Sequence, residues 1–374
     1  MPANVVKLDS VPDPAGELQR AADLLSQGGV IVFPTETVYG VGASAAEEAA
    51  VLRLRSVKGR AGEQPFTVHV ARPADAHAFL TDIPPIGRRL MSKGWPGPLT
   101  LLFSVPSPET TRIYARLSAA GRESIFRGGK VGLRCPDDLN AYEVLSRSSA
   151  PVIASSANRS GRPPPTSAAA AVSEVGDDVD LVLDGGRCMY GRGSTIVSIE
   201  GDQYHISREG VYDARTIRRL AALNILFICT GNTCRSPMAE GIAREMIAKR
   251  LGCSVDQLAE RSILIGSCGT GAIPGYSATD TAIEVCRARG IDISAHRSRP
   301  LSADLVRSAD YIFTMTPRHR EAVLEISPHA EGRIRPLRPD GEIADPLGGP
   351  PEEYEACADR LAQSLEKVVK ELEL

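Results

Sequence analysis

The densest group of reactive side chains in this sequence lies at residues 229–237, in the order Cys-Thr-Gly-Asn-Thr-Cys-Arg-Ser-Pro. A thiolate is a strong nucleophile, and the planar guanidinium of an arginine can bind two oxygens of a phosphate group. Five residues separate Cys229 from Arg235, and Gly231 among them favours a tight turn. The segment therefore predicts a loop that binds a phosphate group and attacks it with Cys229.

The elements on either side of this loop would position it. An apolar run at 223–228 predicts a buried strand. Ser236 and Pro237 predict a helix start, with Ser236 as the N-cap and Pro237 at the first helical position. A loop between a strand and a helix N-terminus directs backbone N–H groups and the positive end of the helix dipole at one point. That field should lower the pKa of Cys229 and favour its thiolate.

The loop resembles the C-x5-R loop of the low-molecular-weight phosphatase family, and residues 224–374 match that family in length and order. The resemblance implies that Cys229 is the nucleophile and that Arg235 binds phosphate. It implies that the other residues of the phosphate loop are Thr230, Gly231, Asn232, Thr233, Cys234 and Ser236. The alternative is that both cysteines are small buried residues and that Arg235 caps a helix, an interpretation that would be favoured for an isolated cysteine.

Residues 344–349, Ala-Asp-Pro-Leu-Gly-Gly, are the other chemical segment of this half. An Asp-Pro in a glycine-rich loop is by itself typical of a turn. The phosphatase family has its general acid in such a loop, so the resemblance implies that Asp345 protonates the leaving group and then activates water. Thr233 and the Asp-Pro-Leu-Gly-Gly order resemble the bacterial protein-arginine phosphatases, which implies a phosphoarginine substrate. Phosphotyrosine is the alternative.

In the first half of the chain, polar segments follow apolar ones. A helix is predicted at Pro14–Ser26 and a buried strand at Val30–Phe33, and a polar, glycine-containing segment follows at 34–42. Another strand at 151–154 leads into hydroxyl and amide side chains at 155–158. Because α/β proteins bind ligands at strand ends, these segments predict a binding site.

Six short segments of this half resemble, in order, the family of threonylcarbamoyl-adenylate synthases. They are Pro-Thr-Glu-Thr-Val-Tyr-Gly, Lys-Gly-Arg, Trp-Pro-Gly-Pro-Leu-Thr, Ser-Ala-Asn, Ser-Gly-x-Pro-x-Pro-Thr and Gly-x-Ser-Thr, within about residues 15–212. The family uses L-threonine, bicarbonate and ATP to make the intermediate for threonylcarbamoyladenosine in tRNA. The resemblance implies that L-threonine is bound by Thr35, Arg134, Ser156 and Ser194, and ATP by Lys58, Arg60, Asn158, Thr166 and Arg208. Mg²⁺ would accompany ATP, bound mainly through its phosphates.

A different interpretation of the first half is an RNA-binding module that lacks synthase activity. Six cationic residues would serve it: Arg112, Arg116, Arg122, Arg127, Lys130 and Arg134. Such charges more often form a solvated face. Threonine-dependent release of pyrophosphate from ATP distinguishes the two interpretations.

The length of 374 residues predicts two domains, since a domain typically has about 150 residues. We expect an α/β protein with a twisted mixed-sheet domain of the synthase type at 10–213, a short helical joint at 214–223, and a small doubly wound parallel-sheet phosphatase domain at 224–374. Strands and helices alternate in the last of these. The expected partners are the tRNA threonylcarbamoyl-transferase machinery, phosphorylated proteins and, through a local contact, tRNA.

Composition excludes several other classes of protein. The formal net charge of -3 provides no overall attraction to nucleic acid or membranes. No segment approaches the roughly 20 apolar residues of a membrane span, and the first 27 residues contain no apolar run typical of a signal peptide, so we expect a cytoplasmic protein. The eight cysteines form no C-x-x-C pair and the six histidines no H-E-x-x-H pattern, which predicts neither structural disulfides nor a metal site. Cys229 and Cys234 flank one loop and could form a reversible disulfide.

Overall fold

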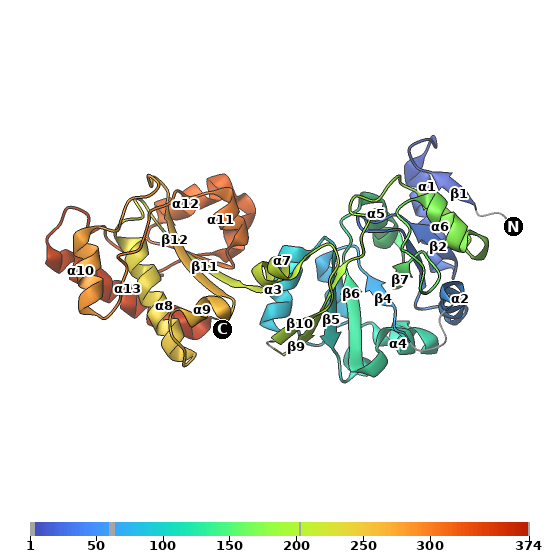
Figure 1. Cartoon of the computed structure of the whole chain (residues 1–374), viewed down its shortest axis with the longest axis horizontal. Coiled ribbons are helices and arrows are strands. Elements are labelled where there is room, and N and C mark those ends of the chain that lie inside the picture. The colour runs from blue at the N-terminus through green and yellow to red at the C-terminus, as the bar shows by residue number, and fades with distance from the viewer. Residues whose placement is uncertain (1–3, 60–63, 202, 373–374) are drawn as a thin grey trace. The chain divides into compact units, whose positions relative to one another are not determined.

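The computed structural model describes residues 4–59, 64–201 and 203–372. The chain divides into two compact units, Met1–Leu220 and Ala221–Leu374, whose elements are labelled in Figure 1. The division falls within the predicted joint, where residues Ala214–Ala221 form helix α7. None of the described helices is both long enough and apolar enough to cross a membrane.

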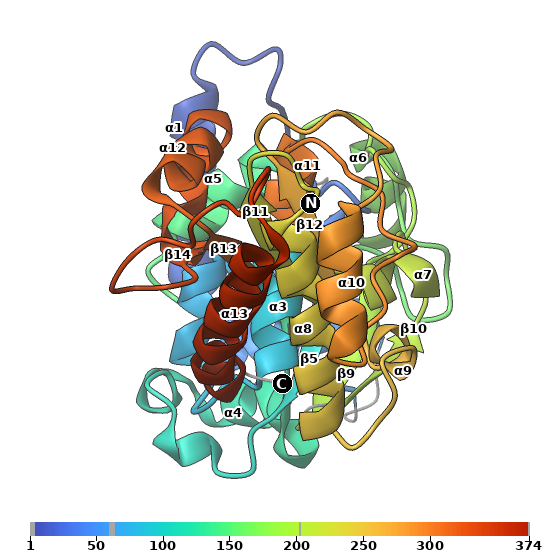
Figure 2. The same cartoon turned by 90° about the vertical axis from the view of Figure 1, so that its left-hand side faces the viewer.

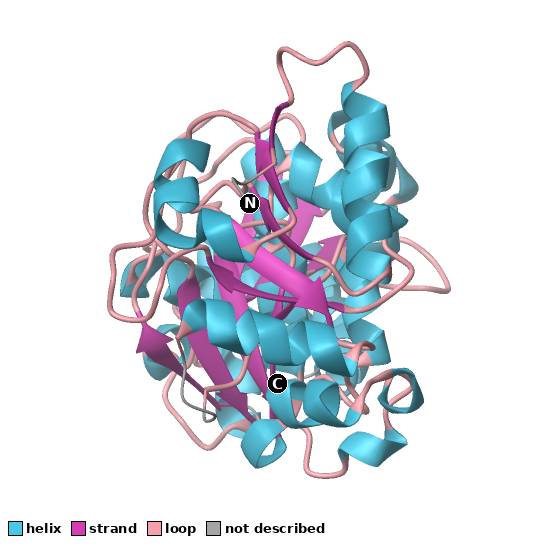
Figure 3. Cartoon of the chain, turned by 90° about the vertical axis from the view of Figure 1, so that its right-hand side faces the viewer, coloured by secondary structure: helices cyan, strands magenta, loops and turns pink. Residues whose placement is uncertain are grey.

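The first unit contains a ten-stranded sheet in the order β1-β8-β2-β3-β7-β4-β6-β5-β9-β10. Parallel pairs such as β4 with β6 and antiparallel pairs such as β5 with β6 occur in it, so the predicted mixed sheet is confirmed. Figure 3 shows strands of this sheet among the helices that cover it. The strands are β1 (Val5–Lys7), β2 (Val30–Phe33), β3 (Gly40–Ser44), β4 (Thr67–His69), β5 (Leu99–Ser104), β6 (Lys130–Arg134), β7 (Val152–Ser156), β8 (Leu181–Asp184), β9 (Thr195–Glu200) and β10 (Gln203–Arg208).

The first helix and the strand after it have the limits that the sequence predicts. Helix α1 begins at Pro14, where the Asp13 side chain accepts a hydrogen bond from the Gly16 N–H, and it ends at Ser26. Helix α1 and helix α5 pack together against β2 and β8 in one apolar cluster. The helices of the unit are α1 (Pro14–Ser26), α2 (Glu48–Lys58), α3 (Pro85–Gly94), α4 (Ala119–Ile125), α5 (Leu139–Arg147), α6 (Ala168–Val175) and α7 (Ala214–Ala221).

The polar, glycine-containing segment at 34–42 leads into a strand that the sequence did not indicate. Gly40–Ser44 forms β3, which pairs antiparallel with both β2 and β7 and is fully buried. Because β3 consists mostly of small residues, its sequence lacks the apolar run from which a buried strand is predicted. They are small because the Phe33 ring covers the strand: a Cβ on Gly42 would lie 3.0 Å from that ring.

The second unit contains a four-stranded sheet in the order β12-β11-β13-β14, and all of its pairs are parallel. The strands are β11 (Leu223–Cys229), β12 (Ile263–Gly269), β13 (Tyr311–Thr314) and β14 (Ile334–Pro336). The helices are α8 (Arg235–Arg250), α9 (Gln257–Glu260), α10 (Asp280–Ala288), α11 (Ala303–Ser308), α12 (Pro317–Ile326) and α13 (Pro351–Glu371).

Both faces of this sheet are covered, as the alternation of side chains along β11 requires. Ile225 and Phe227 join the cluster formed with α8, α10 and α13, three helices that Figure 2 shows together. Leu226 and Ile228 join a second cluster, to which α11 contributes Val306. The predicted doubly wound parallel sheet is confirmed, and β11 at its centre carries Cys229 at its carboxyl end.

Candidate active sites

Cys229 ends β11 beneath the phosphate loop and is 2% exposed. Asn232 turns the loop in a left-handed conformation, with φ of 56°, and its N–H donates to Cys229 Sγ at 3.2 Å. Ser236 Oγ lies 2.9 Å from the same sulfur. The thiol is therefore enclosed by groups that stabilise a negative charge.

Burial nevertheless raises the pKa of the Cys229 thiol above its ordinary value. Hydrogen bonds from Ser236 and Asn232 and the charge of Arg235 act in the opposite direction, and desolvation is the largest effect. The predicted lowering of this pKa is therefore wrong for the structure described. The sequence indicates the field of the loop, but it does not indicate how deeply the sulfur lies.

The helix after the loop begins one residue earlier than predicted. Helix α8 starts at Arg235 with Cys234 as its N-cap, so the prediction that Ser236 is the N-cap is wrong and Pro237 is the third helical residue. Ser236 faces inward instead: its Oγ also accepts a hydrogen bond from Asn232 Nδ2 at 2.9 Å. Its hydroxyl thus interacts with the Cys229 thiol and does not cap the helix.

The structure brings Arg235 and Asp345 together across 110 residues of sequence. Arg235 is 4% exposed and donates through Nη1 to the Ile343 carbonyl at 3.2 Å and through Nη2 to Thr230 Oγ1 at 3.3 Å. Nη2 also forms an ion pair with Asp345 Oδ2, whose side chain is 41% exposed. Within the described chain, the buried Arg235 Nε has no partner. The guanidinium thus retains a donor, and an accessible carboxyl group lies next to it.

Thr233 and Cys234 are adjacent residues of the predicted phosphate loop. Thr233 is half-buried, and its Oγ1 lies 3.7 Å from Cys234 Sγ. Cys234 Sγ also lies 3.6 Å from the Tyr354 hydroxyl. Cys229 and Cys234 are both free thiols. The predicted reversible disulfide between them stays a prediction.

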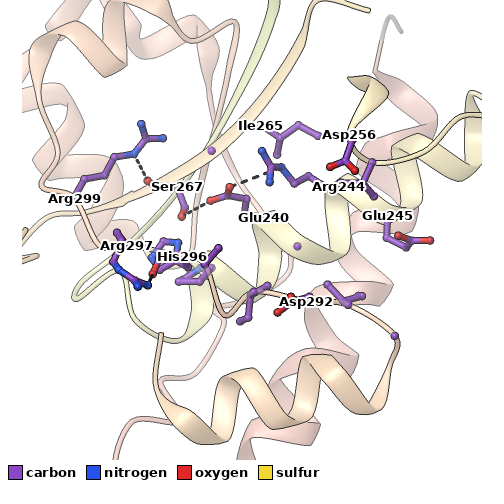
Figure 4. A pocket seen from close by; sticks show the side chains of 18 residues that line it. Glu240, Arg244, Glu245, Asp256, Ile265, Ser267, Asp292, His296, Arg297 and Arg299 are labelled. Carbon is purple, nitrogen blue, oxygen red and sulfur yellow. Dashed lines mark hydrogen bonds and ion pairs between the residues drawn. The ribbon is translucent and has the colours of Figure 1, made fainter. Parts of the chain in front are cut away.

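A cavity of about 680 Å³ lies behind the loop, between α8, β12 and residues 290–299 (Figure 4). Three of its wall residues hold Asn232: Ser267 Oγ accepts from its Nδ2 at 2.9 Å, the Arg299 N–H donates to its Oδ1 at 2.9 Å, and His296 Nε2 donates to its carbonyl at 2.8 Å. Glu240 accepts in turn from the Ser267 hydroxyl at 2.7 Å. No local sequence pattern predicts that these residues contact the loop, because they lie outside the motif and on other elements.

In the first unit, a cavity of about 360 Å³ opens at the ends of several strands. Four of the predicted site residues line it: Arg134, Ser156, Ser194 and Arg208. His69 and Thr100 line it too, and neither was predicted. Burial lowers the pKa of His69 to about 3, and the Arg134 charge acts in the same direction, so this imidazole is neutral at neutral pH.

Arg134 is held by the segment that follows β2. Its Nη2 donates to Glu36 Oε1 at 2.9 Å, Thr37 Oγ1 at 2.6 Å and, more weakly, Thr35 Oγ1 at 3.4 Å. Thr35 itself donates to the Val38 carbonyl at 2.7 Å. In the structure, Thr35 therefore accepts a hydrogen bond from Arg134, and it is not among the described residues that line the cavity.

The opposite wall of this cavity carries Ser194 and Arg208. Ser194 Oγ lies 2.8 Å from Thr100 Oγ1, and Arg208 Nη2 donates to the Ser194 carbonyl at 2.8 Å. Burial lowers the pKa of Arg208, and the charge of Arg134 lowers it further. The guanidinium groups of Arg134 and Arg208 thus line the same cavity, which would favour an anionic ligand.

Three other residues predicted to bind ATP, Lys58, Asn158 and Thr166, are not among the described residues that line this cavity. Lys58 is 1% exposed and donates to the Ser156 carbonyl at 2.5 Å and to the Asn158 carbonyl. Asn158 Oδ1 is buried and has no partner in the described chain. Thr166 accepts a hydrogen bond from the Cys188 N–H at 3.0 Å through its carbonyl. Arg60 lies outside the described residues, and the assignment of these residues to ATP stays a prediction.

The cationic residues considered for RNA binding largely have partners within the protein. Arg127 pairs with Glu123 and Lys130 with Glu200. Arg122 stacks on the Tyr114 ring, with 4.4 Å between Cζ and the ring centroid.

Among the described residues, no group of three or more His, Cys, Asp or Glu side chains could hold a metal ion.

Comparisons with known proteins match each unit separately. A family model described as "Telomere recombination" matches residues 23–210, and one described as low molecular weight phosphotyrosine protein phosphatase matches residues 224–374. The threonylcarbamoyl-AMP synthase of Pyrococcus abyssi is 33% identical over 183 residues, which are 49% of this chain and 51% of that protein. The chain thus spans about half the length of this relative.

The protein-arginine-phosphatase of Geobacillus stearothermophilus is 34% identical over 154 residues, which are 40% of this chain and 95% of that protein. Among solved structures, the P. abyssi Sua5 protein complexed with L-threonine covers 71% of this chain and 92% of its own, with a TM-score of 0.51 and 21% identity. At that identity, the likeness supports the fold of the first unit and nothing finer.

Proposed function

This chain belongs to the threonylcarbamoyl-AMP synthase family in its first half and to the low-molecular-weight phosphatase family in its second, and we propose that it is a bifunctional enzyme with one activity from each. The first would form threonylcarbamoyl-AMP for the modification of tRNA. The second would hydrolyse phosphorylated proteins. Both are proposed to operate in the cytoplasm.

The cavity between Arg134 and Arg208 supports the first activity. In the proposed reaction, the nitrogen of L-threonine attacks the carbon of bicarbonate and water leaves. The carbamate oxygen then attacks the α-phosphorus of ATP and releases pyrophosphate. Every reactant carries negative oxygens, so guanidinium groups fixed in a buried site would stabilise the charges that develop. Arg134 would bind the threonine carboxylate, and Mg²⁺ would enter with ATP.

The observation that carries the second activity is the convergence of Cys229, Arg235 and Asp345 in one unit. Cys229 would attack phosphorus while Asp345 protonates the leaving group. Asp345 would then take a proton from the water that hydrolyses the cysteinyl phosphate. Arg235 would bind the oxygens of the phosphoryl group during both steps. Because burial raises the pKa of the Cys229 thiol, its proton must leave before attack; an oxygen of the dianionic phosphoryl group would accept it, and the Ser236 hydroxyl would then donate a hydrogen bond to the thiolate.

We propose phosphoarginine as the substrate of the phosphatase. The support is Thr233, a half-buried hydroxyl of the phosphate loop, beside which we expect a planar guanidinium to lie. That hydroxyl can accept a hydrogen bond from the substrate N–H groups. The similarity to a named protein-arginine-phosphatase points the same way. Phosphotyrosine remains the alternative.

The test measures both reactions with the intact chain. We expect pyrophosphate release from ATP that requires L-threonine and bicarbonate, and hydrolysis of phosphoarginine faster than of phosphotyrosine. An RNA-binding module would instead show salt-sensitive tRNA binding and no pyrophosphate release. The paired state of Arg122, Arg127 and Lys130 favours the synthase over this candidate.

A further inference from the structure

A buried histidine lies beside the phosphate loop of the second unit. His319 is the third residue of α12 and is 5% exposed. Its Nε2 lies 3.0 Å from Thr230 Oγ1, and its Nδ1 lies 3.0 Å from the hydroxyl of Thr316, the residue before the helix. Neither family resemblance nor motif spacing had singled it out.

We infer the direction of each hydrogen bond from a starting point that is fixed, the Arg235 donor. Arg235 Nη2 can only donate, and it does so to Thr230 Oγ1. The single hydroxyl hydrogen of Thr230 is then free to point at His319 Nε2, which must be unprotonated to accept it. Nδ1 therefore carries the hydrogen and donates to Thr316 Oγ1. With these directions the imidazole is neutral and carries its hydrogen on Nδ1.

The surroundings of His319 favour that neutral form. The positive end of the α12 dipole and the charge of Arg235 both oppose a second positive charge at this position. Asp345 acts in the opposite direction, and burial is the largest effect. Burial and the charge of Arg235 outweigh Asp345 and lower the pKa of His319 to about 4. At neutral pH the ring is thus a fixed acceptor for Thr230.

We propose that His319 is a positioning residue of the phosphatase site: through the Thr230 hydroxyl, it fixes the guanidinium of Arg235 in the orientation that binds the phosphoryl group. The inference rests on the proposed phosphatase function. Without the acceptor at His319, the Thr230 hydroxyl turns away from its bond to the ring and no longer fixes Nη2. Arg235 then keeps only the Ile343 carbonyl and Asp345, and it moves toward Asp345.

The two variants that test this differ in one acceptor. In His319→Gln, the side-chain oxygen can take the place of Nε2, whereas His319→Leu fills the space without an acceptor. We expect His319→Leu to lower kcat/KM for p-nitrophenyl phosphate about ten-fold and to weaken competitive inhibition by inorganic phosphate to a similar degree. His319→Gln should stay within about three-fold of the unaltered chain. His329→Gln, an exposed histidine, is the control and should change neither value.

A double-mutant cycle separates positioning from general loss of structure. Thr230→Val should reproduce the effect of His319→Leu, and the two together should cost no more than either alone. Equal losses in His319→Leu and His319→Gln, or additive losses in the double variant, would overturn the proposal. If His319→Leu does not fold, a loss in Thr230→Val with near-original turnover in His319→Gln supports the proposal, and an equal change in these two variants overturns it.

Two measurements do not depend on turnover. Nitrogen NMR of the imidazole should show His319 neutral at pH 7 with the hydrogen on Nδ1, and the other tautomer would contradict the bond directions. Titration with inorganic phosphate should show weaker binding in His319→Leu. A chain that hydrolyses neither phosphoarginine nor a phosphoester but meets both expectations would disprove the proposed phosphatase function and leave the positioning of Arg235 standing.

Discussion

At the scale of single residues, one substitution at Cys229 can separate the two proposed activities. Cys229→Ser replaces the nucleophile by a hydroxyl that ionises far less readily. We expect hydrolysis of both phosphoarginine and phosphotyrosine to vanish, while threonine-dependent pyrophosphate release persists. Cys253→Ser is the matched control, since it alters a half-buried free cysteine of the same unit outside the phosphate loop and should retain turnover. Hydrolysis near the original rate in Cys229→Ser would exclude the covalent mechanism.

Thr233 provides a second test at this scale, directed at the substrate. Thr233→Ile keeps the branched shape but removes the acceptor for the guanidinium N–H groups. Leaving those groups unpaired should cost about 1–3 kcal/mol, or roughly ten- to a hundred-fold in kcat/KM for phosphoarginine. A phenyl ring has no N–H and gains apolar contact, so phosphotyrosine hydrolysis should hold or rise.

The measurement for Thr233→Ile is kcat/KM for both substrates, in the variant and in the original chain. The two values should change in opposite directions. An equal fall for both substrates, or an original chain that already prefers phosphotyrosine, would contradict the assignment to phosphoarginine.

At the scale of elements, Lys58 links the end of α2 to the end of β7. Its ammonium donates to the carbonyl of Ser156, the last residue of β7, and to that of Asn158, two residues later. Lys58→Met fills similar space without a donor and removes these two bonds, although the Ser156 carbonyl keeps a hydrogen bond from the Asn158 N–H. Each buried group without a partner costs about 1–3 kcal/mol. We therefore expect a lower melting temperature of the first unit together with loss of pyrophosphate release.

The control for Lys58→Met is Arg53→Met, which removes an exposed cation from the same helix. Surface ion pairs contribute only about 0–1 kcal/mol, so both stability and synthesis should change little. A Lys58→Met chain of full stability and full synthesis would contradict both the structural role described and the predicted part in ATP binding. Loss of synthesis alone would favour a direct role in catalysis.

At the scale of the whole molecule, each unit contains one buried neutral histidine. Burial lowers the pKa of His69 to about 3 and that of His319 to about 4, below the ordinary 6.5. Between these values and 6.5, the unfolded chain binds more protons than the folded one, so stability increases with pH. The contribution is present above pH 6.5 and is lost as the pH falls toward 4.

The measurement is thermal unfolding of each unit's transition at pH 7 and pH 5. We expect both melting temperatures to be lower at pH 5. In His319→Gln, the second unit loses this titrating group and its transition should depend less on pH, whereas His329→Gln should leave the dependence unchanged. An identical pH dependence in His319→Gln and the original chain would show that carboxylates alone cause it.

The sequence by itself determined the parts that depend on neighbouring residues. The limits of α1 follow from its Asp13 cap and apolar spacing, and β2 follows from four consecutive apolar residues. The strand, loop and helix around Cys229 can likewise be predicted from neighbouring residues. The two families were recognisable because their motifs are short and contiguous, and the alternation of strands and helices sufficed for the parallel sheet of the second unit.

Only the tertiary structure decided which distant side chains meet and how deeply they are buried. The sheet brings Arg134 to Glu36 across 98 residues, and the loop brings Thr230 to His319 across 89. Such contacts depend on strand register and helix packing, which no local pattern encodes. Burial likewise reversed the expected pKa shift of Cys229, because desolvation depends on every element packed around the sulfur and not on the loop that contains it.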